Sequence, residues 1–181
     1  FLDRHDYPDK FLLYIGRLES KKNVLSLIKA YKKTSRKWPL ILAGRPGNYG
    51  YAAIEKMCAE TDLKDDIMLL GYVSQVNYPK LMASATGFVF PSKFEGFGLP
   101  VLEAMASGVP VTCSNILALK EVAQDAALYF DPDNIEDIKN KIEIIFNNQE
   151  QRTDLIAKGL ERAKQFSWSK VARETLDYIL E

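Results

Sequence analysis

The sequence contains one histidine and two cysteines among its 181 residues. His5 alone cannot supply a histidine-based nucleophilic triad or a multi-histidine metal site, so the sequence lacks the parts for these two kinds of centre. Two cysteines are also too few for a disulfide framework or a structural zinc site. Cys58 and Cys113 stand in apolar patterns, and we expect both to be core thiols of a reduced, cytoplasmic protein.

Long apolar runs and net charge are also lacking. No run of about eighteen apolar residues is present, so no membrane span is predicted. The 24 basic and 24 acidic residues cancel, so no overall field attracts nucleic acid. Nine bases and one acid lie between Lys10 and Lys37, mostly on one helix face. A solvated face explains this excess, and we expect only weak attraction to an anionic membrane, since exposed charges are screened within about 8 Å.

Six short apolar segments alternate with helical patterns along the chain. The predicted strands cover 11–16, 39–44, 67–72, 87–92, 109–114 and 127–130. Buried parallel strands have this nearly continuous apolar character, and the segments between them repeat apolar residues at helical spacing. The pattern predicts an α/β protein with a doubly wound, Rossmann-like parallel sheet of about six strands. The single domain, 1–181, comprises a lead-in (1–10), an alternating core (11–132) and C-terminal helices (133–181).

The C-terminal part is predicted to form three helices. Asn134 and Ser167 stand where N-caps of two of them are expected. We expect this helical tail to cover the sheet or to reach another domain.

The segment "PSKFEGFGLP" follows the fourth predicted strand, and ligands of open parallel sheets bind at such strand ends. Gly96 and Gly98 allow close approach of a ligand, and Pro100 suits the first turn of the helix that follows. The free N–H groups of this helix start form an anion site suited to phosphate. Val101 replaces the third glycine of the dinucleotide-binding fingerprint, so the motif alone is weak evidence.

Glu103 lies one helical turn after Leu99, in a stripe with Leu102 and Ala106 that we expect to face inward. An unpaired carboxylate there would be costly. Two interpretations stay open from spacing alone. In the first, Glu103 is structural and either forms a salt bridge or is exposed to water. In the second, it accepts hydrogen bonds from the paired hydroxyls of a ribose.

Arg17 and Lys22 follow the first predicted strand and supply cations. Two cations beside a helix-start anion site could neutralise a diphosphate without a metal ion. The alternative is that they belong to the basic helix face, which is the better interpretation for Lys22 taken alone but not for Arg17. The segment "GRPGNYG" lacks the Lys-Ser or Lys-Thr of a phosphate-binding loop and is interpreted as a flexible turn.

The segment "FEGFGLPVLEAMASGVPVTCSN" resembles the signature of the retaining, nucleotide-sugar-dependent glycosyltransferases of family 4, the group 1 family with the two-domain GT-B fold. "YIGRLESKKN", "LILAG", "LLGYVS", "LMASA" and "LKEVAQDAALYFDP" extend the resemblance in family order from about Phe11 to Pro132. Glu95 and Glu103 match the paired glutamates of that family. The resemblance implies that this chain is the C-terminal, donor-binding half of such an enzyme, and that the N-terminal acceptor-binding domain is absent.

The resemblance also implies roles for single residues at the phosphate and ribose. Arg17 and Lys22 would hold the donor diphosphate, and Gly98 and Leu99 would give it backbone N–H groups. Glu103 would bind the ribose hydroxyls. Asn23 departs from the usual glycine after the lysine, and an asparagine can replace that glycine in a left-handed or capping conformation.

Other implied roles concern the base and the sugar. Tyr72 and Val73 would meet the base. Glu95 would be the catalytic residue beside the transferred sugar, and Gly96 and Phe97 would line the sugar pocket, Phe97 through its backbone. The loop "ILAL" at 116–119 departs from the family version, so no sugar contact is assigned to it.

The leading hypothesis is the donor half of a retaining hexosyltransferase. It would take mannose or glucose from a UDP- or GDP-sugar, without a metal cofactor, and pass it to a glycan or lipid-linked acceptor. The alternative is a non-catalytic nucleotide-binding or assembly module on the same fold, against which the presence of Arg17, Lys22, Glu95 and Glu103 speaks. A flavodoxin-like domain is disfavoured because "GRLESKKN" is not an acidic cluster.

Overall fold

The computed structural model describes residues 7–60 and 62–180. Its centre is a six-stranded parallel sheet in the order β3-β2-β1-β4-β5-β6. The strands are β1 (Leu12–Ile15), β2 (Leu40–Ala43), β3 (Ile67–Gly71), β4 (Gly87–Phe90), β5 (Val111–Ser114) and β6 (Ala127–Phe130). All residues of β1, β2, β4 and β5 are buried, as apolar strands between two helical layers must be. The prediction of a doubly wound, Rossmann-like sheet is confirmed.

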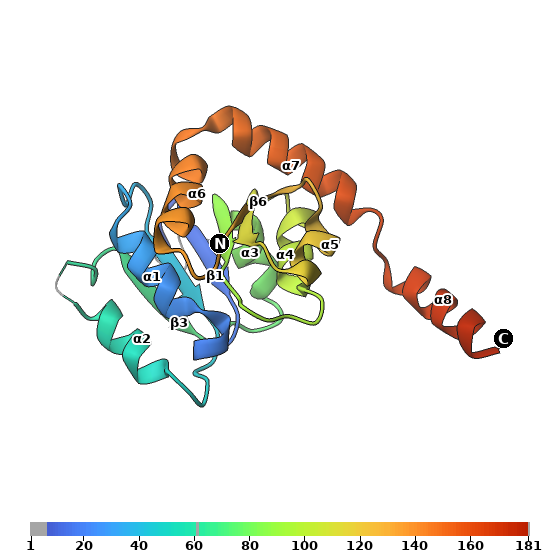
Figure 1. Ribbon diagram of the computed structural model, residues 1–181, viewed down its shortest axis with the longest axis horizontal. Helices are drawn as coiled ribbons and strands as arrows, with labels where there is room; N and C mark the ends of the chain where they lie inside the picture. Colours follow the sequence, from blue (N-terminus) through green and yellow to red (C-terminus); the bar gives the residue numbers. More distant parts are fainter. Residues whose placement is uncertain (1–6, 61, 181) are drawn as a thin grey trace.

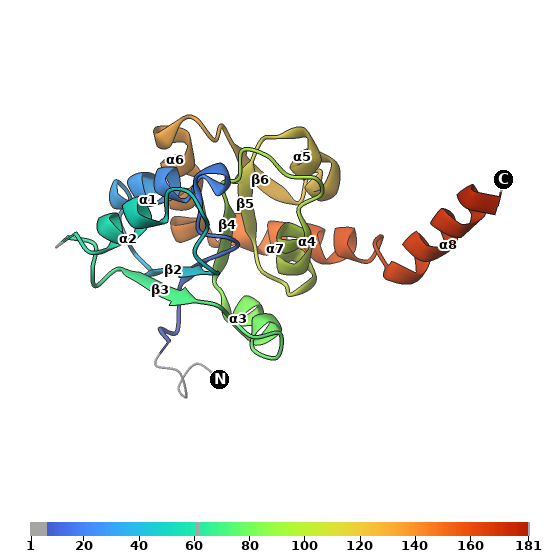
Figure 2. The same ribbon diagram turned by 90° about the horizontal axis from the view of Figure 1, so that it is seen from below.

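Helices form a layer on each face of the sheet (Figures 1 and 2). One layer packs α1 (Val24–Lys32) against α2 (Tyr51–Cys58) and α6 (Ile135–Asn147). The other is centred on α4 (Leu99–Ala106), which contacts its three neighbours in that layer: α3 (Tyr78–Ser84), α5 (Leu117–Ala123) and α7 (Gln149–Ala163). The chain therefore passes from one face to the other and back, and this winding sets which loops become neighbours.

The direction of winding reverses between β1 and β4. From β1 the chain winds outward to β2 and β3, then crosses to β4 and continues the other way to β5 and β6. The loops that follow β1 and β4 are adjacent at the carboxyl edge of the sheet and depart in opposite directions. A crevice opens at such a reversal, which is where open α/β sheets bind their ligands.

Glycines let the loops after β1 and β2 approach each other closely. Gly16 follows β1 and Gly44 follows β2, and the backbone of Gly44 has φ of 146°. A Cβ on Gly44 would lie 1.8 Å from the carbonyl oxygen of Gly16. Only glycine fits at position 44, so this contact fixes the spacing of the two loops at the site.

Two of the C-terminal helices, α6 and α8, begin at the predicted caps. Asn134 Oδ1 accepts hydrogen bonds from two N–H groups in the first turn of α6, and Ser167 Oγ accepts one from Lys170 N at the start of α8 (Trp168–Leu180). Helices α6 and α7 bury apolar residues against the body, whereas α8 has no buried residue and extends away from it (Figures 1 and 2). Helix α6 therefore covers the sheet and α7 covers α4, whereas α8 covers neither.

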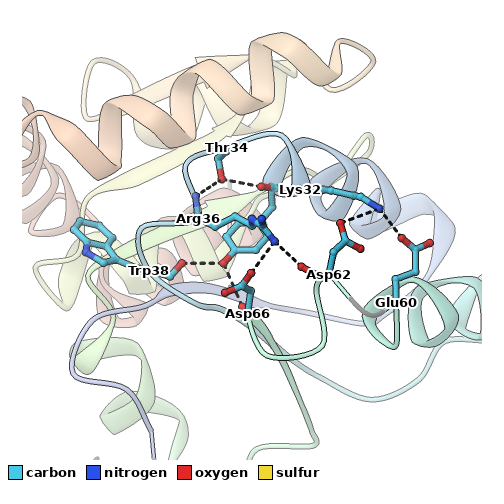
Figure 3. Close-up of polar contacts among 8 residues, drawn as sticks. Lys32, Thr34, Arg36, Trp38, Glu60, Asp62 and Asp66 are labelled. Carbon is cyan, nitrogen blue, oxygen red and sulfur yellow. Dashed lines mark hydrogen bonds and ion pairs between the residues drawn. The ribbon is translucent and has the colours of Figure 1, made fainter.

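The basic residues around α1 are largely paired with acids. Figure 3 shows Lys32 between Glu60 and Asp62, and Arg36 bound to the side chain of Asp66 and the carbonyl of Asp62. Lys33 pairs with Glu136 of α6 in the same way. The pairs of Lys32 and Arg36 lie at the amino ends of β2 and β3, and the pair of Lys33 joins the end of α1 to α6. Together they offset much of the local charge on which an attraction to anionic lipid would depend.

Both cysteines are buried and free, as predicted. Burial raises the pKa of the Cys58 thiol to about 11 and raises the pKa of Cys113 as well. The two residues are packed core thiols. His5 and the first six residues of the expected lead-in lie outside the described residues.

Candidate functional site

The loop after β4 leaves a row of backbone donors unused. Among the residues that the structure describes, none accepts a hydrogen bond from the N–H groups of Phe94 through Leu99. Gly98 is buried with φ of 101°, and a Cβ there would lie 2.4 Å from the Leu119 side chain. Pro100 occupies the first turn of α4, as predicted. The loop thus has free N–H groups and a helix start at the carboxyl edge of the sheet, which is an arrangement suited to an anion.

Lys22 and Glu95 bring the loops after β1 and β4 together. Lys22 Nζ lies 2.6 Å from Glu95 Oε1, and only 19% and 13% of these side chains are exposed. The ammonium also lies 6.0 Å from the Phe90 ring centroid. Since an ammonium group has three N–H donors, two remain for a further acceptor at this point. The structure therefore places a cation and a carboxylate together at the reversal between β1 and β4.

Asn23 shapes the turn that places Lys22. Its backbone is left-handed with φ of 58°, so the prediction that it replaces a glycine in this conformation is confirmed. Its side chain does not cap α1. The side-chain amide donates instead to the Pro132 carbonyl oxygen at 2.8 Å. The expected capping hydrogen bond is absent because the amide ties this loop to the one after β6.

Arg17 is exposed, and no other described residue pairs with its guanidinium. Its carbonyl oxygen accepts a hydrogen bond of 2.9 Å from the buried Tyr14 hydroxyl. Burial raises the pKa of Tyr14, with the nearby charges of Glu95 and Glu19 adding to the shift. Tyr14 therefore stays protonated and holds the backbone of the loop, which leaves the Arg17 side chain available to a ligand.

Glu103 does not lie on an inward stripe, and that prediction is wrong. The buried residues of α4 are Val101, Ala104 and Met105, whereas Glu103 is exposed. Leu99 is 43% exposed, and Ala106 also faces outward. The helix carries apolar residues on nearly every side, and the stripe that packs on β4, β5 and α7 excludes Glu103. The argument from the cost of burial does not apply to this carboxylate.

Tyr78 is a partner of Glu103 that the sequence did not reveal. The Tyr78 hydroxyl donates to Glu103 Oε2 from the first turn of α3. Burial is the largest cause that raises the pKa of Tyr78, and the hydrogen bond to Glu103 adds to it. The only sequence signal was a tyrosine at the helix start that follows the loop "GYVSQ".

Arg45 and Tyr72 stack at the β3 side of the site. The Arg45 guanidinium lies 4.4 Å from the Tyr72 ring centroid, and 59% of Tyr72 is exposed. Val73 beside it is half-buried against the core. Arg45 follows β2 as Arg17 follows β1, each after a glycine, and this repeated Gly-Arg was the signal that could have identified it.

The segment 44–50 is not an independent turn. Leu18 N donates to Arg45 O at 3.0 Å, and Gly47 N donates to Leu18 O at 2.9 Å. Ser20 N also donates to Tyr49 O at 3.0 Å. The interpretation of a flexible turn overlooked that parallel pairing of β1 and β2 continues into their loops.

The Phe97 ring packs on the connection between α7 and α8. The ring packs edge-on against Phe166 with 5.8 Å between centroids, and Phe166 lies in the connection between α7 and α8. Arg162 stacks on the other ring at 4.6 Å. Gly96 is exposed and has open space where a Cβ would stand. The arrangement leaves the backbone of both residues accessible, so their role as sugar contacts stays a prediction.

A separate hollow of about 600 Å³ lies at the amino ends of β2 and β3. Pro39, Lys64, Asp65 and Met68 are among the residues that line it. None of the predicted site residues belongs to it. Because parallel sheets bind ligands at the opposite, carboxyl edge, the crevice between β1 and β4 is the candidate site.

Comparison with known proteins identifies the family. A family model described as "Glycosyl transferases group 1" matches residues 4–162. The chain belongs to the group 1 glycosyltransferases. All predicted site residues of this group 1 glycosyltransferase fall inside the matched range, whereas α8 lies beyond it.

Two curated relatives of this glycosyltransferase chain have described activities. O-antigen chain mannosyltransferase B of Escherichia coli is 40% identical over 171 residues, which cover 92% of this chain and 45% of that protein. O-antigen chain mannosyltransferase RfbU of Salmonella typhimurium is 34% identical over 150 residues, covering 83% of this chain and 41% of that protein. The chain spans less than half the length of these relatives.

Solved structures share the fold. HepE of Anabaena in complex with UDP matches with a TM-score of 0.88 and 18% identity, over 98% of this chain and 50% of that one. Sucrose-phosphate synthase of Thermosynechococcus elongatus matches with a TM-score of 0.86 and 24% identity, over 98% and 47% of the two chains. At these identities the likeness establishes the fold, a Rossmann-like half of the GT-B type, which confirms the prediction.

Proposed function

We propose that this chain is the donor-binding half of a retaining hexosyltransferase that uses a UDP- or GDP-sugar. The observation that carries the proposal is the set of unused N–H groups from Phe94 to Leu99, in the loop that Glu95 joins to Lys22. Arg17, in the same loop as Lys22, supplies a second positive charge. Two relatives are named as O-antigen mannosyltransferases, which favours mannose as the sugar. A glycan or a lipid-linked sugar is the acceptor class that we propose.

The positive charge in the crevice suits the leaving group of this reaction. Negative charge builds up on the diphosphate as its bond to the sugar breaks. Arg17, Lys22 and the N–H groups of Gly98 and Leu99 are the donors that we propose for this charge, since preorganised donors act most strongly where charge develops. With these donors in place, we propose that transfer needs no metal cofactor.

Glu95 is the candidate catalytic residue. It forms an ion pair with Lys22, and we propose that this pair holds it where the diphosphate site meets the sugar site. We propose that it contacts the hydroxyls of the transferred sugar and stabilises positive charge at the anomeric carbon. The backbones of Gly96 and Phe97 line the same pocket in this proposal.

We propose that the remaining contacts are made to the nucleoside. Tyr72 and Val73 at the end of β3 are the proposed base contacts, and Arg45 stacked on Tyr72 extends this surface. Glu103, exposed on α4, is the proposed acceptor for the ribose hydroxyls. The base and the diphosphate would then follow the carboxyl edge of the sheet from β3 to β4.

The whole enzyme needs a second part in this proposal. The relatives are about twice as long as this chain, and α8 carries exposed large apolar residues with no partner in the described part of the chain. They are Trp168, Val171, Leu176, Tyr178, Ile179 and Leu180. We propose that an N-terminal acceptor-binding domain completes the enzyme, and that this chain alone binds nucleotide but turns over poorly.

Within residues 7–60 and 62–180, no helix combines the length and the apolar character that crossing a bilayer requires. We propose a cytoplasmic protein with weak peripheral membrane contact. The ion pairs around α1 reduce the charge available for such contact, as described above.

Calorimetric titration with UDP and GDP tests the proposal. We expect one of them to bind to the 181-residue chain, and Glu103→Ala to weaken that binding about 10- to 100-fold, because ribose hydroxyls lose a charged acceptor. Glu121→Ala, an exposed glutamate on α5, is the matched control and should leave the affinity unchanged. No binding of either nucleotide at about 1 mM would refute the assignment.

A further inference from the structure

Tyr78 and Glu103 meet across two helices. Glu103 lies on the exposed side of α4, and its Oε2 accepts the hydrogen bond of the Tyr78 hydroxyl from α3. Among the described residues, nothing donates to Glu103 Oε1. One oxygen of the carboxylate is therefore held by the protein while the other remains available.

Backbone hydrogen bonds hold the turn from which the Tyr78 side chain projects. Tyr78 N donates to the carbonyl of Ser74 at 2.8 Å, and Asn77 N donates to the same oxygen at 3.0 Å. The Tyr78 ring is half-buried against the core, and Pro79 follows it in the first turn of α3. The turn from Ser74 to Asn77 directly follows Tyr72 and Val73. This turn and Tyr78 therefore connect the proposed base contacts with the Glu103 carboxylate.

An exposed glutamate without a partner samples several side-chain rotamers, and a ligand that needs one of them must select it. A carboxylate has about four acceptor positions on its two oxygens. One hydrogen bond to Oε2 restricts its rotation and leaves Oε1 and the second lone pair of Oε2 free. Two neighbouring hydroxyls of a sugar can donate to these two remaining positions.

We infer that Tyr78 is a positioning residue, which holds the Glu103 carboxylate in the orientation that accepts both hydroxyls of the donor ribose. The inference rests on the proposed donor-binding function. It adds a residue that acts through Glu103 without touching the reacting atoms. It also explains why a tyrosine stands at the start of α3 with its hydroxyl turned to another helix.

The variant Tyr78→Phe removes only the hydroxyl and keeps the packed ring. We expect about five- to tenfold weaker calorimetric binding of whichever of UDP and GDP binds better. The matching 2′,3′-dideoxynucleoside diphosphate should lose less than about twofold, since it has no ribose hydroxyls to orient. In a Glu103→Gln background, the second substitution should add little, because the charged acceptor is already gone.

Tyr129→Phe is the matched control. The Tyr129 hydroxyl also donates to a described partner, the Gln124 carbonyl, but Tyr129 lies on β6 at the opposite edge of the sheet from β3. This variant should bind both ligands as the unsubstituted chain does.

Other outcomes overturn the inference. Equal weakening for the ribose and dideoxy ligands would show a general structural effect, and unchanged binding would show no role. Tighter binding by Tyr78→Phe would show that the hydroxyl blocks Glu103. In all three cases the donor-binding function stands. If the unsubstituted chain binds neither nucleotide, the proposed function fails and this inference fails with it.

Discussion

Lys22→Ala is expected to weaken nucleoside diphosphate binding about 100-fold, equivalent to about 2.7 kcal/mol. Two effects combine in this variant. The diphosphate loses a cation that is largely buried at the crevice, and Glu95 loses its partner at 2.6 Å. The carboxylate then stands unpaired beside the site of an anionic ligand, and repulsion adds to the loss. Calorimetry or ligand-induced thermal shift measures the change.

Lys29→Ala serves as the control for this variant. Lys29 is exposed on α1, one of the basic residues that face solvent, and its loss should change the affinity less than about twofold. If both variants bind alike, the affinity arises from general positive charge and Lys22 has no specific role. The contrast decides between the two interpretations of Lys22 that the sequence left open.

Gly44→Ala is expected to destabilise the protein by about 4 kcal/mol or more, which lowers the melting temperature by about 10 °C. The new Cβ would lie 1.8 Å from the Gly16 carbonyl oxygen, and backbone atoms cannot move aside as a flexible side chain can. The φ of 146° adds strain for any residue with a side chain. Thermal or urea unfolding measures the loss.

Gly108→Ala separates strain from collision. Gly108 also has positive φ, 70°, but no atom lies within 4 Å of the position of its Cβ. This variant should lose only about 1 kcal/mol. Equal losses at both positions would mean that the loops after β1 and β2 have room to separate, which contradicts the close contact described above.

The sheet could be predicted from the sequence because each buried strand is a short apolar run between polar loops. The structure has six strands within the predicted segments, and β2, for example, occupies Leu40–Ala43 of the predicted 39–44. Asn134 and Ser167 were identifiable as caps because capping depends only on neighbours in the chain. Local rules were therefore sufficient for the strands and for these two caps, but not for Asn23, whose side chain bonds to the loop after β6.

The orientation of α4 could not be predicted in this way. The helix has apolar residues on several sides, so the stripe with Leu99 and Leu102 and the stripe with Val101 and Met105 both fit a buried face. The packing of α4 on β4, β5 and α7 decides between them, and α7 lies about 50 residues further along the chain.

The partners across the site were also beyond local reasoning. Arg45 meets Tyr72, and Tyr78 meets Glu103, through contacts between separate strands and helices. Such contacts depend on strand order, which periodicity does not reveal. The positions of Arg17, Lys22 and Glu95 were found because each follows a strand end. Their roles, like those of Gly98 and Leu99, stay predictions until a ligand is bound.

Backbone NMR of the ¹⁵N-labelled chain tests the central claim most directly. On addition of the better-binding of UDP and GDP, we predict that the largest amide shifts fall on residues 94–99, whose N–H groups have no acceptor in the described protein. Hydrogen bonds to phosphate would account for such shifts. Shifts confined to the hollow lined by Lys64, Asp65 and Met68, or no shifts at saturating nucleotide, would contradict the proposed donor site.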